Sequence, residues 1–193
     1  MLVISCHADT GFRTHTLKRL RGGILKGHLD NFVGVHAVMK AYFSGRMRPR
    51  GVRIELTHGE EKNFRGAKEV RRTLRGHDVV IVVDVTGTPT NKAFVIEKCG
   101  HLGLQAFFRQ ALRKMAFDLY EECPDPISDE DEVDVYLRKT KLCAFLGIPC
   151  FGGDYNAGPV RCREASIEAA TEALIRVSQA FPRFCRQQDI RST

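Results

Sequence analysis

One stretch of sequence decides the fold: Asp78-Val79-Val80-Ile81-Val82-Val83-Asp84-Val85. A run so uniformly rich in β-branched residues predicts a central strand of a parallel sheet, because such strands are buried on both faces and show no polar alternation. Asp84 lies near the carboxyl end of this run, where an unpaired carboxylate is costly to bury unless a cation compensates its charge. The stretch therefore predicts a buried parallel strand with a carboxylate at one end.

Strands and helices alternate on both sides of this stretch. The remaining expected strands span residues 2–5, 52–57, 93–97 and 142–151, the last interrupted by Gly147. The expected helices span residues 31–43, 66–74, 102–120 and 166–181, with Pro182 stopping the last. A further helix is expected to run through Lys139, capped or preceded by the acidic run over 128–134. This alternation predicts an α/β fold, a three-layer α/β/α sandwich with a mostly parallel central sheet that binds ligands at the carboxyl ends of its strands.

The length of 193 residues predicts one domain with a substantial core and leaves little room for a second. We expect this domain to span residues 1–182, with a C-terminal tail over 183–193. The net charge of +7 favours acidic partners. Arg46 to Arg53 form a basic stretch, so a basic interaction module is one alternative. Nucleic-acid binding is not expected, because no known motif accompanies these residues and aromatics do not interleave with them.

The seven cysteines are odd in number and include no Cys-x-x-Cys pair. This pattern argues against a disulfide framework and fits a reducing compartment. The opening residues Met1 to Ile4 are too short for the apolar region of a signal peptide, and no apolar stretch approaches ~18 residues. We therefore expect a cytoplasmic protein without a membrane partner.

Four short segments carry acidic or histidine side chains where hydrophobic runs end or helices begin. They are Cys6-His7-Ala8-Asp9, Gly27-His28-Leu29-Asp30-Asn31, Thr57-His58-Gly59-Glu60-Glu61 and Val83-Asp84-Val85-Thr86. Side chains at these places can converge on one edge of a sheet. Imidazole nitrogens and carboxylate oxygens bind zinc, and a hydrolytic site leaves one position open for water. Their order along the chain predicts a metal-dependent hydrolase.

Each of these residues also has a structural interpretation. Asp30 before a helix can bridge two metals or simply cap the helix. Glu60 and Glu61 are adjacent on an expected extended loop. One of them can bind metal while the other acts as general base, or both can be solvated surface residues. Asp9 can fix the tautomer of His7, although a His-x-Asp sequence is common by chance.

Taken together, four parts of the sequence resemble the motif series of the co-catalytic zinc exopeptidases. They are His7-Ala8-Asp9-Thr10-Gly11-Phe12, Asp30-Asn31, Glu60-Glu61 followed by Gly66-Ala67, and Asp84. That clan includes leucyl aminopeptidases, tetrahedral aminopeptidases and aminoacylase-like deacylases. The similarity extends from residue 3 to about residue 180, because Gly147-Ile148-Pro149 and Glu164 to Leu174 resemble the closing strand and the last helix. The expected domain over 1–182 is thus similar to a minimal zinc-peptidase catalytic domain without a lid insertion.

The resemblance implies a zinc-dependent aminopeptidase or amidohydrolase that cleaves an amide bond in a peptide or an N-acyl amino acid. It implies one or two Zn²⁺ ions, with other divalent metals possible, and a possible homo-oligomer. The implied roles are a bridging ligand at Asp30, ligands of one ion at His7 and Asp84, a ligand of the other at Glu61, a general base at Glu60 and support of His7 by Asp9.

One departure from the clan concerns its final histidine ligand, expected near residues 158–164. Every histidine of this chain lies at or before His101. Cys162, Asp154 or another side chain can take that place, and Arg161 can bind a substrate carboxylate in a bidentate manner. His58 can contact substrate because it lies two residues before the expected base. The missing histidine keeps open an alternative, a degenerate noncatalytic member that binds one metal or a small ligand.

Overall fold

The computed structural model describes residues 1–128 and 130–191. Its strands, taken over the described residues, are β1 (Leu2–His7), β2 (Leu17–Leu20), β3 (Ile24–Gly27), β4 (Val52–Thr57), β5 (Val79–Thr86), β6 (Phe94–Glu97), β7 (Phe117–Leu119), β8 (Cys143–Phe151) and β9 (Val160–Arg163). Its helices are α1 (Phe32–Phe43), α2 (Glu60–Asn63), α3 (Arg65–Thr73), α4 (Leu102–Ala111), α5 (Glu132–Leu137) and α6 (Glu164–Arg191).

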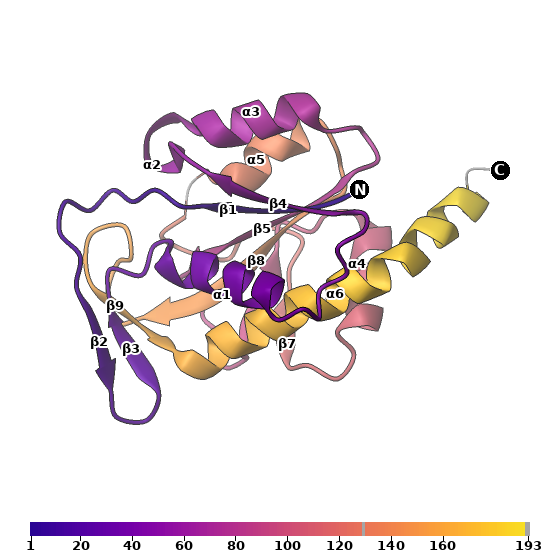
Figure 1. Cartoon of the computed structure of the whole chain (residues 1–193). Coiled ribbons are helices and arrows are strands. Elements are labelled where there is room, and N and C mark those ends of the chain that lie inside the picture. Colours follow the sequence, from indigo (N-terminus) through magenta and orange to yellow (C-terminus); the bar gives the residue numbers. More distant parts are fainter. Residues whose placement is uncertain (129, 192–193) are drawn as a thin grey trace.

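The strands form one sheet in the order β2-β3-β9-β8-β5-β1-β4, and β6 and β7 pair beside β8. Helices α3 and α5 cover one face, and α1, α4 and α6 cover the other (Figure 1). Two hydrophobic clusters fill the spaces between these layers and the sheet. The predicted α/β sandwich is therefore confirmed.

The sheet is mixed, so the prediction of a mostly parallel sheet was wrong. Strands β4, β1, β5 and β8 run parallel, and the predicted central strand is β5, buried along its whole length. The pairs β2-β3, β3-β9, β8-β9 and β6-β8 are antiparallel. The β2-β3 hairpin gave no hydrophobic signal in the sequence, because every residue of β2 is exposed.

Two helix boundaries also differ from prediction. The helix expected over 102–120 ends at Ala111, and β7 follows because Phe117 stacks on Phe94 of β6 with ring centroids 5.4 Å apart. The last helix continues through Pro182 instead of stopping there. Phe181 and Phe184 on either side of Pro182 are buried in the core, and this packing offsets the backbone hydrogen bond that proline cannot donate.

Strand β8 passes through Gly147 without interruption, contrary to the expected break. Gly147 lies between Asp84 of β5 and Val95 of β6. A Cβ atom there would lie 2.6 Å from Thr86 Cγ2 and 2.8 Å from Val95 Cγ2. Glycine is required by close packing at this point rather than by a turn.

None of the seven cysteines forms a disulfide within the described residues. Within the described part of the chain, no helix combines the length and the apolar character needed to cross a bilayer.

Candidate metal centre

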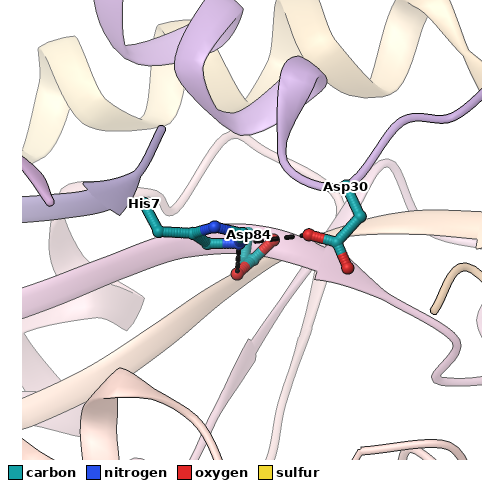
Figure 2. Close-up of side chains that lie close together, drawn as sticks. All are labelled: His7, Asp30 and Asp84. Carbon is teal, nitrogen blue, oxygen red and sulfur yellow. Dashed lines mark ion pairs between the residues drawn. The ribbon is translucent and has the colours of Figure 1, made fainter. Parts of the chain in front are cut away.

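Three of the predicted side chains meet at the carboxyl ends of the parallel strands (Figure 2). His7 is the last residue of β1, Asp84 lies near the end of β5, and Asp30 precedes α1. His7 Nε2 lies 3.0 Å from Asp84 Oδ2 and 3.1 Å from Asp30 Oδ1. All three side chains are buried. The structure thus gathers one imidazole and two carboxylates within metal-binding distance of one another.

Asn31 explains how Asp30 reaches this position. Its Oδ1 accepts a hydrogen bond from Gly34 N at 3.0 Å and caps α1. Its Nδ2 donates to Val83 O at 2.9 Å and so ties the start of α1 to β5. Because Asn31 caps the helix, the Asp30 carboxylate is free of the capping role that its position also allowed.

Glu60 and Glu61 join the same site from the other side. They begin the one-turn helix α2 rather than lying in the extended loop that we expected. Ligand atoms of His7, Glu60 and Glu61 lie within 4.8 Å of one another, so His7 is common to two possible metal-binding groups. Gly11 allows the close approach of Glu61, since a Cβ atom at Gly11 would lie 2.8 Å from Glu61 Oε2.

Asp9 lies between the two groups. Its Oδ1 is 3.6 Å from His7 Nδ1 and accepts a hydrogen bond from Glu60 N at 3.4 Å. His7 Nδ1 is buried and makes no hydrogen bond within the described residues. Asp30 Oδ1 has His7 Nε2 at 3.1 Å as its partner, but the same ring nitrogen also faces Asp84 Oδ2 at 3.0 Å. The site therefore contains buried polar atoms that the described protein groups do not satisfy.

The pKa values of the ionisable side chains in this site reflect their burial and the closeness of several negative charges. Burial, and to a lesser extent the charges of Asp84 and Asp30, raise the pKa of Glu60 to about 8, although His7 opposes the shift. Burial and the charge of Asp30 likewise raise the pKa of Asp84. Burial alone would lower the pKa of His7, but Asp84 and Asp30 outweigh it and raise the pKa to about 12. A cation at this site would offset the repulsion between the carboxylates.

A hollow of about 180 Å³ opens onto the cluster and is lined by His7, Asp30, Glu60 and Asp84. The hollow is also lined by Tyr155 and Asn156, along with Ser128, Glu130 and Asp131. The sequence analysis did not identify any of these five residues. Tyr155 and Asn156 follow Gly152-Gly153, a glycine pair with positive φ that turns the chain back after β8, and this pair was their one signal in the sequence.

Four other sequence candidates do not line this hollow. His58 and Arg161 are exposed, and His58 borders a separate groove between β4 and α3. Cys162 is fully buried in β9. Asp154 is exposed, and its Oδ1 accepts a hydrogen bond from Asn156 N at 2.8 Å.

A second set of buried carboxylates lies just beyond the end of β5. Thr86 Oγ1 donates to Glu97 Oε1 at 3.3 Å and to Asp125 Oδ2 at 3.2 Å. Thr88 Oγ1 also donates to Glu97. Tyr155 OH donates to Asp125 Oδ2 at 2.7 Å, so this network holds one wall of the hollow. We call these residues the Glu97–Asp125 network.

Solved structures with a similar fold are aminopeptidases. A TET aminopeptidase from a marine sediment Thaumarchaeota archaeon aligns with a TM-score of 0.71 and 14% identity over 88% of this chain and 55% of its own. A TET1 peptidase from Pyrococcus horikoshii aligns with a TM-score of 0.68 and 13% identity over 85% and 52%. An aminopeptidase from Thermotoga maritima aligns with a TM-score of 0.62 and 11% identity over 84% and 48%.

This chain has the fold of those aminopeptidases. At such low identity the likeness shows the fold alone, and the chain spans about half the length of each of these structures. No family model and no curated protein matches the sequence. The likeness nevertheless agrees with the sequence-based resemblance to the co-catalytic exopeptidases, which was drawn from the residues that meet at the metal centre.

Proposed function

We propose that this protein is a metal-dependent hydrolase that cleaves an amide bond, as an aminopeptidase or an N-acyl deacylase. One observation carries the proposal: the buried carboxylates of Asp30 and Asp84 converge on a single ring nitrogen, His7 Nε2, at the strand ends. Buried carboxylates at such distances are costly unless a cation pairs with them. The aminopeptidase fold of the solved neighbours supports the reaction class.

In this proposal each residue of the cluster keeps the role that the family resemblance implies. Asp30, His7 and Asp84 would hold one ion, and Glu61 together with Asp30 would hold a second. The ligand atoms of His7, Asp30 and Asp84 lie within 4.8 Å of one another, which supports the first of these sites. Asp9 orients His7 through the ring nitrogen that faces away from Asp30 and Asp84. Zn²⁺ fits this mixture of imidazole and carboxylate ligands, and other divalent ions with similar preferences fit as well.

Glu60 is the proposed general base. It lines the hollow beside the ligands, and its raised pKa places its proton affinity in the range useful for proton transfer near neutral pH. When bound, a divalent ion would supply a polarised water and a Lewis acid for the scissile carbonyl. Glu60 would accept the proton of the attacking water and return it to the departing nitrogen, which leaves as an amine.

Asn156 is the side chain that we propose for the place of the missing final histidine. It lines the same hollow as Glu60, whereas Cys162 and Asp154 do not line it. Its amide oxygen is a neutral ligand of the kind that harder divalent ions accept. Exchange of a histidine for an asparagine at this position would weaken the affinity for zinc relative to manganese or magnesium.

The alternative of a noncatalytic, one-metal or ligand-binding protein rests on a specific observation. His7 is the sole imidazole among the described residues that line the hollow. Elemental analysis of the purified protein separates the two readings in part. Two metal equivalents support the hydrolase, one equivalent is compatible with both, and no metal favours the noncatalytic protein.

Glu60→Gln tests the proposed reaction. With aminoacyl anilides and N-acyl amino acids as substrates, we expect turnover to fall by about 10² to 10⁴-fold while the metal content stays unchanged. Glu69→Gln, on the exposed surface of α3, is the matched control and should leave both quantities unchanged. Hydrolysis at the wild-type rate in Glu60→Gln would remove Glu60 as the base.

A further inference from the structure

Strand β4 ends the sheet and pairs with β1 alone among the described strands. Gly51 O and Thr57 O accept hydrogen bonds from Leu2 N and Ala8 N, both at 2.9 Å, so the backbone of these residues faces β1. By the alternation of a strand, Val52, Ile54 and Leu56 direct their N–H and C=O groups away from the sheet. An edge with such groups is a template for another strand.

We infer that this edge is an interface with a second copy of the same chain. The strand Val52-Arg53-Ile54-Glu55-Leu56 reads as apolar, positive, apolar, negative, apolar. In an antiparallel pairing about Ile54, Arg53 of each copy lies opposite Glu55 of the other. Within one chain Arg53 Nε already lies 2.7 Å from Glu55 Oε1. The pairing adds a cross-strand partner of opposite charge to each of these side chains, so four charges alternate around the two-fold axis and stabilise the joined sheet.

The backbone pattern selects the same register. Pairing about Ile54 sets Ile54 opposite Ile54 and Val52 opposite Leu56, and all of these residues have outward N–H and C=O groups to exchange. A centre at Arg53 would set two arginines opposite each other, and a centre at Glu55 would set two glutamates opposite each other. Charge and hydrogen bonding therefore agree on one register.

The surface beside this edge is apolar on the α1 side. Tyr42 is 57% exposed, Phe43 is 74% exposed and Leu56 is 45% exposed. A hollow of about 660 Å³ lies between this end of α1 and strand β4, and its walls include Met47 and Ile54. A second copy added along β4 would cover this surface with its own apolar residues, as expected for the contiguous apolar patch of an interface.

Strand β2, at the other end of the main strand order, lacks this self-complementarity. Strand β2 reads Leu17-Lys18-Arg19-Leu20 and is exposed throughout. Antiparallel pairing of two such strands about their centre would place Lys18 opposite Arg19 and repel the second copy. Of the two strands that end the main strand order, β4 is therefore suited to a second copy and β2 is protected against it.

Exchange of the two charges tests this interface. The whole wild-type chain should sediment as a dimer of twice 21.7 kDa in analytical ultracentrifugation. Arg53→Glu alone and Glu55→Arg alone each set like charges opposite one another, so each should raise the dimer dissociation constant about tenfold or more. The double variant should recover the wild-type constant within about threefold, and an equimolar mixture of the two single variants should form a heterodimer.

Arg109→Glu, on the exposed surface of α4 and away from both strands, is the matched control and should leave the mass unchanged. Circular dichroism should show that every variant is folded. Weak dimers form at concentrations up to roughly 100 µM. A wild-type chain that stays monomeric at about that concentration would overturn the proposal. A dimer or larger assembly that is insensitive to both single exchanges would overturn it too, because another surface would then hold the copies together. These outcomes do not depend on the metal centre.

Discussion

Two sets of buried carboxylates lie near the end of β5, one around Asp84 and the other around Thr86, and they differ in what surrounds them. In the Glu97–Asp125 network, Thr86, Thr88 and Tyr155 donate hydroxyl hydrogen bonds to the carboxylates. At the candidate metal centre, Asp84 accepts from Val85 N, and Asp30 Oδ1 and Asp84 Oδ2 share the single ring nitrogen His7 Nε2. Several hydroxyl donors satisfy the first set, whereas the second shares one nitrogen, which is the arrangement on which we base the proposed cation site.

The comparison shows that burial alone does not identify a functional carboxylate. Burial raises the pKa of Glu97 to about 7, in the same direction as it raises the pKa values of Glu60 and Asp84. What differs is the number of donors within reach. A carboxylate supplied with donors costs less to bury, and one without them requires a counter-ion.

Asp84→Asn should have the largest effect. Loss of a direct ligand should exceed the ~100-fold that is typical of losing an outer partner, so we expect metal affinity to fall on the order of 1,000-fold. Glu97→Gln is the matched control, and its metal affinity should stay within a few fold of wild type. Isothermal titration with Zn²⁺ measures both. Equal losses in the two variants would mean that the two sets do not differ in the way proposed.

Glu97→Gln should instead change the pH dependence of stability. The pKa of Glu97 rises from its ordinary 4.5 to about 7, so between these values the folded protein keeps a proton that the unfolded chain has lost. Stability therefore falls as pH rises from 4.5 to 7, by roughly 3 kcal/mol at about 1.4 kcal/mol per pKa unit.

In Glu97→Gln this part of the decrease should disappear. Urea unfolding at pH 4.5 and pH 7.5, with the metal-free protein in both cases, measures the difference. The same slope in wild type and variant would show that Glu97 titrates at its ordinary pKa.

Added metal should stabilise the protein through the metal centre. At a free concentration 100 times the dissociation constant, a ligand that binds the folded state alone contributes about 2.7 kcal/mol. This corresponds to a rise in melting temperature of about 5–10 °C for a domain of this size. Thermal melts with and without EDTA measure it, and Asp84→Asn should show little of the rise.

Tyr155→Phe should have the smallest effect on stability. It removes the hydrogen bond from Tyr155 OH to Asp125 Oδ2, and a hydrogen bond to a charged group contributes about 1.5 kcal/mol. Asp125 keeps its bond from Gly87 N at 2.7 Å, so the loss should not be larger. Chemical denaturation measures it. If turnover also falls while metal content stays constant, Tyr155 positions the wall of the hollow for substrate.

Much of the fold could be predicted because local patterns carried it. The β-branched run of β5 identified a strand buried on both faces, and the strand Val52–Thr57 and the helix capped by Asn31 followed the expected periodicity. The exposed strand β2 gave no such pattern, since its pairing depends on β3 rather than on burial. Phe117 lies in a strand because it stacks on Phe94. Phe94 is 23 positions earlier in the chain, so no local propensity could indicate this pairing.

The sequence by itself determined which side chains could form the site, since the ligand types and their places at strand ends are local properties of the chain. The tertiary structure alone decided which of them meet. It brought His7, Asp30 and Asp84 together, left His58 and Arg161 outside, and added Asn156 from a loop. The physical reason is that proximity across a sheet depends on strand order and register, which arise from contacts between segments far apart in sequence.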